Sequence, residues 1–193
     1  MNTNGTALRS RVADAIDLLA DPVGDLAPAR LSGDEFVSLL REVGNLARLV
    51  SAAETALAGE AANRASGPID TLGALGYANA VEAVAIQTSA SDPEAKRRTR
   101  LGTALNSGLS STGAETGSAH PHVAASMRAG NLGPEAALII VDAFDKISSR
   151  IDPALVLEAE ESIVRLAEGT QEVPPLRADL VRDQVAVFIA AID

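Results

Sequence analysis

Four basic side chains gather within five positions of the segment Ser91–Leu105, SDPEAKRRTRLGTAL. The whole chain has 193 residues and a formal net charge of −10, so this cluster stands against an acidic background. Lysine and arginine are the residues that contact the phosphates of nucleic acids. The segment is predicted to be a helix, because Ser91 or Asp92 can cap its start and Pro93 suits its first position. The candidate DNA-binding residues are Lys96, Arg97, Arg98 and Arg100.

A second predicted helix, Ala78–Gln87, precedes the basic segment, and a short turn joins the two. This order resembles a helix-turn-helix, in which the second helix enters the major groove of DNA. Arg97 and Arg100 share one helical face, Lys96 and Arg100 share an adjacent one, and Arg98 points elsewhere. The pattern therefore predicts double-stranded DNA as a partner. The alternative is a solvated helix face whose cations pair with the acidic surface of a neighbouring helix.

The acidic balance of the chain limits how DNA could be bound. A pI near 4.6 excludes a protein that coats DNA through generally basic faces. From Pro134 onward there are twelve acidic and five basic residues, and this part would repel a duplex wherever it faced one. The charges therefore indicate a local contact at most, and they slightly favour a protein partner.

The other residues that could do chemistry form no complete site. His120 and His122 are the only histidines and Glu115 is the nearest further ligand, whereas a metal site needs three or four ligands. Glu158 and Glu161 share a helical face but lack the histidine that carboxylate-bridged metal sites use. The sequence holds no cysteine, no nucleophile with an assigned base and no phosphate-binding glycine loop. We therefore predict no catalytic residue, no metal, no cofactor and no small-molecule substrate in this chain.

A long helix, predicted from Ser32 to Arg64, carries the second candidate site. It begins with a capping box, Ser-Gly-Asp-Glu, in which the serine and the glutamate satisfy each other's backbone amides. Apolar residues then recur in a heptad-like pattern over about four heptads. The stripe either packs against other helices of the chain or forms a coiled-coil homo-oligomer. The candidate interaction stripe is Phe36, Leu39, Val43, Leu46, Val50 and Leu57.

Composition and periodicity predict an all-α fold, an irregular multi-helix bundle with one long helix and a helix-turn-helix-like pair. Alanine and leucine dominate the hydrophobic residues, and the chain has no tryptophan, one tyrosine and three phenylalanines. We expect the long helix to pack against the apolar helices Pro134–Ser148 and Leu176–Ile192.

The sequence also predicts the limits of the N-terminal part and of one later helix. Residues 1–30 are predicted to form an N-terminal helix, which Asp21-Pro22 ends, and a linker. Residues 31–193 are predicted to form a helical domain with a possible subdomain break at 108–119. Within it, a helix is predicted to start at Asp152-Pro153 and to run through Ala167, where Gly169 terminates it.

Targeting signals are missing from the sequence. The N-terminus lacks the basic start and apolar run of a secretory signal, and no apolar run is long enough to cross a membrane. We therefore expect a soluble cytoplasmic protein with no membrane partner. The last predicted helix runs into Asp193 without a closing cap, which suggests a domain of a longer protein.

Two sequence blocks resemble a known family. They are GYANAVEAVAIQTSASDPEAKRRTRLGTAL and HVAASMRAGNLGPEAALIIVDAFDKI. Both resemble blocks of the domain of unknown function 222, also called the 13E12-repeat family, and the likeness covers roughly Ser32–Asp193. The chain departs from the common pattern at Tyr77, because many members carry a tryptophan in the helix after the preceding glycine.

The resemblance implies a helical N-terminal domain of bacterial proteins that often end in an HNH nuclease module. Such a module is a hydrolase site with a divalent metal, and this sequence contains none, so no catalytic residue carries over. The resemblance therefore predicts a non-catalytic accessory domain of an HNH-type endonuclease that docks on DNA through the basic helix. The alternative is a protein-interaction or homo-oligomerisation module built on the long heptad-like helix.

Overall fold

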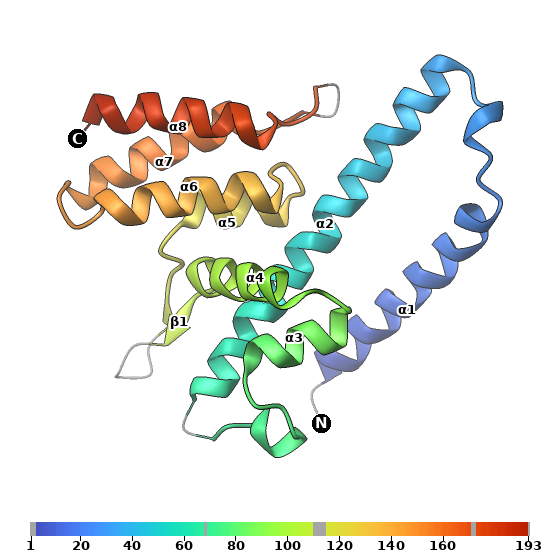
Figure 1. The fold of residues 1–193 in the computed structure, drawn as a ribbon, viewed down its shortest axis with the longest axis horizontal. Coiled ribbons are helices and arrows are strands. Elements are labelled where there is room, and N and C mark those ends of the chain that lie inside the picture. The colour runs from blue at the N-terminus through green and yellow to red at the C-terminus, as the bar shows by residue number, and fades with distance from the viewer. Residues whose placement is uncertain (1–2, 68, 110–114, 171–172, 193) are drawn as a thin grey trace. The chain divides into compact units, whose positions relative to one another are not determined.

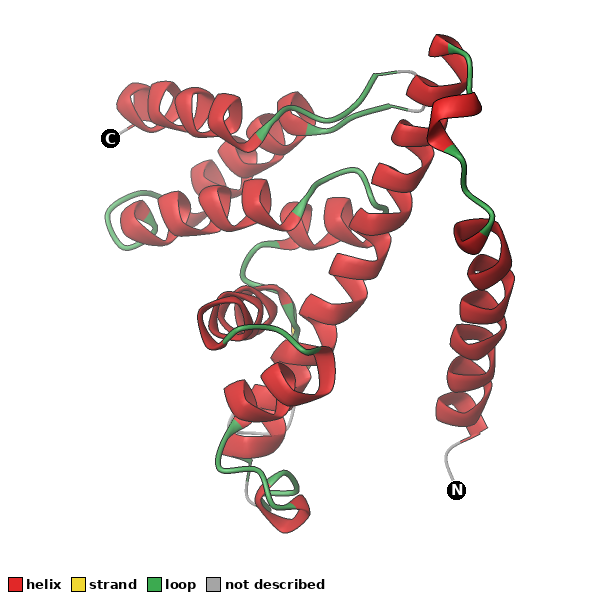
Figure 2. Cartoon of the chain, turned by 45° about the vertical axis from the view of Figure 1, so that its right-hand side comes forward, coloured by secondary structure: helices red, strands yellow, loops and turns green. Residues whose placement is uncertain are grey.

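A computed structural model describes residues 3–67, 69–109, 115–170 and 173–192 of the chain (Figures 1 and 2). The described residues form eight α-helices, so the predicted all-α fold is confirmed. Two short 3₁₀ helices lie at Pro28–Arg30 and Gly73–Leu75, and the two-residue strands β1 (Gly108–Leu109) and β2 (Glu115–Thr116) pair antiparallel. The helices are α1 Thr3–Gly24, α2 Gly33–Ser66, α3 Ala80–Thr88, α4 Asp92–Leu105, α5 Pro121–Arg128, α6 Pro134–Ile147, α7 Pro153–Ala167 and α8 Ala178–Ile192.

The chain divides into two compact units, residues 1–42 and residues 43–193. The division falls inside α2, so the first unit holds α1 and the start of α2, and the second unit holds the rest. The predicted subdomain break at 108–119 lies within the second unit, where β1 and β2 pair. The predicted domain division after residue 30 stays a prediction.

The start of α2 follows from the predicted capping box. The Ser32 amide donates to Glu35 Oε2 at 2.9 Å, and the Glu35 amide donates to Ser32 Oγ at 3.3 Å. These two bonds satisfy amides that have no partner inside the helix. The hydrogen bonds that Glu35 accepts, from the Ser32 backbone and then from its hydroxyl, lower the pKa of this carboxyl.

Helix α1 extends further than the sequence pattern predicts. The Asp21-Pro22 pair was expected to end it, but the helix continues to Gly24. Pro22 removes only its own N–H, and the Asp25 amide still donates to the Asp21 carbonyl at 3.0 Å. A proline near the end of a helix therefore does not stop the last turn from forming.

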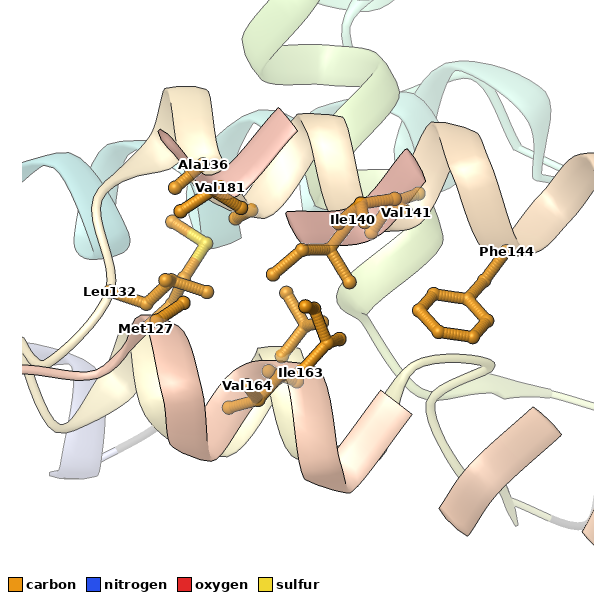
Figure 3. Close-up of a cluster of buried hydrophobic side chains, with 14 of the residues drawn as sticks. Met127, Leu132, Ala136, Ile140, Val141, Phe144, Ile163, Val164 and Val181 are labelled. Atoms are coloured by element: carbon orange, nitrogen blue, oxygen red, sulfur yellow. The ribbon is translucent and has the colours of Figure 1, made fainter. Parts of the chain in front are cut away.

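The main core of the second unit lies among α4 to α8 (Figure 3). Helix α6 packs against α4, α5, α7 and α8, and its apolar face is covered along its length. The side chains of Ile140 and Phe144 from α6 and of Ile163 from α7 have no exposed surface. Burying such side chains removes the most apolar area from water and stabilises the bundle.

Within the second unit, the C-terminal part of α2 crosses α4. The crossing uses glycines from both helices, because a Cβ atom on Gly102 would collide with the Thr55 carbonyl oxygen and with the backbone of Gly59. A small cluster of Ala58, Val84 and Ala95 lies beside it. Ala52 of α2 packs against the main core, and the expected packing of the long helix along α6 and α8 stays a prediction. Small side chains allow α2 and α4 to approach closely, and this face is not the apolar stripe.

Candidate interaction surfaces

The predicted helix pair is present at the basic cluster. Helix α3 begins at an Asn79 cap, whose side chain accepts the Glu82 amide at 2.9 Å. Ser89 ends α3 in the left-handed region at φ 52°, and α4 then starts at Asp92 and packs against α3. The turn between the two helices is therefore short and sharply reversed, as the helix-turn-helix-like pattern predicts.

Three of the four predicted DNA-binding residues form ion pairs. Arg97 contacts Glu94 through Nη2 at 2.5 Å, and Arg98 contacts both Glu94 at 3.0 Å and Glu54 at 3.1 Å. Arg100 pairs with an aspartate of α6, as described below. Two of these pairs, Arg98 with Glu54 and Arg100 with the aspartate of α6, are the alternative that the sequence left open, in which the cations meet acidic groups of neighbouring helices; Glu94 belongs to α4 itself.

The cations differ in how far they remain accessible. The Arg98 side chain is 22% exposed, whereas those of Arg97 and Arg100 are 61% and 59% exposed. Lys96 is exposed and forms no ion pair with any part of the chain that the structure describes. Hydrogen bonding by Arg97 is the largest influence on Glu94, and with Arg98 it lowers the pKa of this carboxyl against the opposing effect of burial. The acidic partners therefore neutralise part of the positive charge of α4.

The apolar stripe of α2 lies on the surface. Phe36, Val43, Leu46, Val50 and Leu57 are between 38% and 68% exposed, and Leu39 is half-buried. Large apolar side chains in a contiguous row on a surface mark sites of protein interaction. The stripe residues of the second unit, Val43, Leu46, Val50 and Leu57, are therefore not covered by the core that buries α6.

Within the second unit, polar bonds join the opposite side of α2 to the neighbouring segments. Arg48 Nε donates to the Gly130 carbonyl at 2.7 Å, and Asn106 Nδ2 donates to the Ala56 carbonyl at 3.1 Å. Together with the glycine crossing, these bonds determine which face of α2 meets the bundle. The apolar stripe consequently faces away from these contacts.

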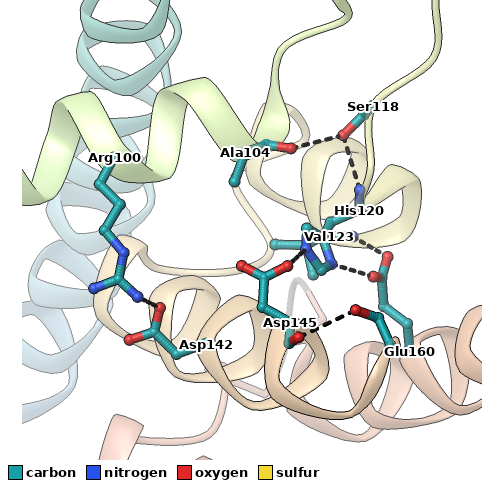
Figure 4. A network of polar contacts seen from close by, with 9 residues as sticks. Arg100, Ala104, Ser118, His120, Val123, Asp142, Asp145 and Glu160 are labelled. Carbon is teal, nitrogen blue, oxygen red and sulfur yellow. Dashed lines mark hydrogen bonds and ion pairs between the residues drawn. The ribbon is translucent and has the colours of Figure 1, made fainter. Parts of the chain in front are cut away.

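The histidine region forms a buried polar network (Figure 4). His120 lies at the start of α5, with Nδ1 2.7 Å from Glu160 Oε2 and Nε2 3.1 Å from Asp145 Oδ1. The other oxygen of Glu160 accepts the amides of His122 at 3.0 Å and Val123 at 3.4 Å. Glu160 therefore caps the first turn of α5 and binds the imidazole at the same time.

These partners shift the pKa of His120. Burial is the largest single influence and lowers its pKa, but the hydrogen bond and charge of Glu160, followed by those of Asp145, raise the pKa above its ordinary value. The protonated ring can donate to both carboxylates, whereas the neutral ring has only one N–H. The network ties α5, α6 and α7 together, and its carboxylates favour the protonated form of the ring.

Sequence reasoning singled out His120 but missed Glu160 and Asp145. Glu160 lies on the buried face of α7, between Val156 and Ile163, and is fully buried. A carboxylate on an otherwise apolar helical face was the signal that could have found it, because a buried charge needs a partner. Its partner is 40 residues away in the sequence, a separation that no local pattern reveals.

The other predicted chemistry can be placed only in part. In the described portion of the chain, no three histidine, aspartate or glutamate side chains gather to hold a metal ion. Glu161 pairs with Arg165 at 2.5 Å, as expected for a solvated acidic face. The side chain of Glu115 lies outside the described residues, and the prediction that the chain holds no metal or cofactor stays a prediction.

Comparisons with known proteins find no relative of the chain. No family model matches it, and neither do any of the curated proteins or the solved structures. The resemblance to the domain of unknown function 222 therefore stays a prediction. Among the residues placed by the structure, none of the helices is both long enough and apolar enough to cross a membrane.

Proposed function

We propose that this protein is an interaction module that self-associates through the apolar stripe of α2. The observation that carries the proposal is the exposure of the stripe: five of its six side chains, all large and apolar, are at least 38% exposed. The stripe runs from position 36 to position 57, which corresponds to about 33 Å of helix. A row of this length and period matches the seam of a two-helix coiled coil.

Self-association gives these side chains a place to be buried. Each large apolar side chain that becomes fully buried contributes about 1.5–3 kcal/mol relative to its exposed state. A second copy offers an identical stripe, and a two-fold axis pairs like residues or related residues across the interface. The interface thus needs only residues already present on α2.

Sedimentation equilibrium of the full chain tests this proposal. The wild type is expected to form a dimer, and Val43→Asp with Val50→Asp is expected to yield a monomer with unchanged helical content. Leu155→Asp is the matched control, because Leu155 is 55% exposed on α7 and lies outside the stripe. A wild type that stays monomeric at high concentration contradicts the proposal.

DNA docking through α4 is the second candidate function. It is supported by Lys96, which has no ionic partner in the described chain, and by the exposed side chains of Arg97 and Arg100. In this role the chain would be the non-catalytic accessory domain of an HNH-type endonuclease, as the family resemblance implies. For either function we propose a cytoplasmic protein, as the sequence predicts.

Fluorescence anisotropy with a labelled duplex, measured at two salt concentrations, distinguishes the two candidates. Three phosphate contacts would give a slope of about −2.7 in log affinity against log salt concentration. Charge reversal of Lys96, Arg97, Arg98 and Arg100 should abolish this binding, whereas the Val43→Asp and Val50→Asp changes should not. Binding that is absent at low salt rules DNA docking out.

A further inference from the structure

A groove of about 670 Å³ runs between α6 and α8. Ile139, Ala143 and Ile147 form its α6 wall, and Val185 and Ile189 are on its α8 wall. Its floor is therefore apolar, although both helices also contribute to the buried core. Pockets that hold small molecules in proteins have volumes in this range, so the groove is large enough to take several side chains of a partner.

The rim of the groove is basic. Lys146, Arg150 and Arg182 line it, and Asp142 is the one acidic residue among its lining. Asp142 already binds Arg100, so its charge is matched from α4 (Figure 4). Lys146 and Arg182 have no ionic partner among the residues that the structure describes. The groove thus carries excess positive charge on a chain whose net charge is −10.

A second cavity of about 520 Å³ continues the groove toward α4 and shares Ile139, Asp142 and Arg182 with it. Thr55 lies in its lining, and the buried hydroxyl of this residue has no hydrogen-bond partner in the described chain. Arg97 and Arg98 also line this cavity, but both are paired with Glu94. The unmatched cations are therefore those of the α6–α8 groove.

We propose that the α6–α8 groove binds an amphipathic helix of a partner protein that carries acidic residues beside its apolar face. An amphipathic helix fits an apolar groove by placing side chains at every third or fourth position on the floor. Glutamate or aspartate on its flanks would meet Lys146 and Arg182, and this charge complementarity sets its orientation and speeds its association. Helix α6 has 14 residues, so a partner helix of about four turns can follow it along its length.

The charges of the groove argue against a duplex as its occupant. Two unmatched cations give few phosphate contacts, and the apolar floor would stay exposed beneath a rigid double helix. This surface is also separate from the α2 stripe, so the inference stands whether or not the chain forms a dimer.

Fluorescence anisotropy of the full chain with a labelled synthetic peptide tests the inference. The probe is a helical peptide of about 18 residues with leucine on one face and glutamate on both flanks, long enough to follow α6. Saturable binding is expected, and Lys146→Glu with Arg182→Glu should weaken it by about tenfold. Arg9→Glu with Arg11→Glu makes the same change in net charge at exposed positions of α1 outside the groove lining and should leave the affinity unchanged.

One further protein variant and one further peptide test which molecule occupies the groove. Ala186→Trp fills the exposed floor and should block the peptide without changing charge. A peptide with lysine in place of glutamate should bind at least tenfold more weakly than the acidic probe. Equal binding of the two peptides, no binding of either, or an unchanged affinity after charge reversal would overturn the inference. A dimer of the chain alone that dissociates on Lys146→Glu with Arg182→Glu would also overturn it, because a second copy would then occupy the groove.

Discussion

Helices α2 and α6 both carry a row of large apolar side chains, but only one row is covered. Ile140, Phe144 and Ile147 of α6 are at most 2% exposed, whereas Val50 and Leu57 of α2 are at least 50% exposed. Both rows have a helical period, so the period alone does not distinguish a core face from a binding face. The two rows differ in exposure because α2 and α6 meet their neighbouring helices through different kinds of residue.

The crossing residues explain the difference. Helix α6 meets its neighbours through its largest side chains, which interdigitate with those of α7 and α8. Helix α2 meets α4 through Gly59 and Gly102, where only small residues fit. A helix that docks through its small-residue face leaves its large apolar residues available for another protein.

The largest expected effect is a difference in stability between a substitution in the α6 row and one in the α2 row. Phe144→Ala should lower the free energy of unfolding by about 3–5 kcal/mol, because it opens a cavity in a fully packed site. Leu57→Ala should change this free energy by no more than about 0.5 kcal/mol, measured on the monomer. Chemical denaturation measures both, and similar losses would show that the stripe is part of the core.

The glycine crossing gives the next effect. Gly102→Ala should lower the free energy of unfolding by about 1–3 kcal/mol, because its Cβ atom would collide with backbone that cannot move away freely. Gly44→Ala is the control, since its Cβ atom would meet only the Arg48 side chain at 3.6 Å. That change should raise the stability by about 0.5–1 kcal/mol, because glycine weakens a helix interior. Thermal unfolding of both variants measures the difference, and a stabilised Gly102→Ala protein would show that α2 and α4 do not touch.

The His120 network of the second unit should make the free energy of unfolding depend on pH. The pKa of His120 is raised in the folded state. The protonated ring therefore stabilises the folded protein fully at a pH below the unfolded pKa, and this stabilisation is lost as the pH rises through the folded pKa. The free energy of unfolding should therefore fall as the pH rises above the ordinary histidine pKa of about 6.5. His120→Gln should flatten this part of the curve, and His122→Gln should retain it. An identical pH profile for the wild type and His120→Gln would contradict the assigned network.

The smallest effect concerns the exposed ion pairs of α4. Arg97→Gln should cost no more than about 1 kcal/mol, because its pair with Glu94 is exposed and screened by salt. Arg98→Gln should cost more, since Arg98 is less exposed and binds both Glu54 and Glu94. Denaturation at low and high salt measures both, and an equal loss would remove the distinction between a solvated pair and an anchoring pair.

Local features of the fold could be predicted from the sequence. The Ser32 capping box, the start of α7 at Pro153 and the end of that helix at Ala167 follow from short-range rules that the structure confirms. Their physical causes act over three or four residues, so one sequence contains them. The predicted end of α1 before Pro22 was wrong because one missing amide does not outweigh a further turn.

Long-range features could not be predicted in the same way. The partners of His120 lie 25 and 40 residues away, and the glycine crossing joins residues 43 positions apart in the chain, Gly59 and Gly102. The contact of the long helix with α6 and α8 stays a prediction for the same reason, because apolar character alone does not select a partner. The stripe on α2 stays a candidate: the sequence shows an apolar row, but its exposure is visible only with the neighbours in place.

Disulfide cross-linking between copies tests the central claim most directly, because the chain has no cysteine of its own. Val43→Cys with Val50→Cys places two thiols on the stripe, about 10.5 Å apart along the helix and too far apart to pair within one copy. A parallel dimer with the two stripes in register joins like positions and yields a covalent dimer on mild oxidation. Leu155→Cys with Ser162→Cys, with the same spacing on α7, should stay monomeric. A monomeric stripe variant, or equal cross-linking of both variants, would contradict a parallel dimer formed through α2.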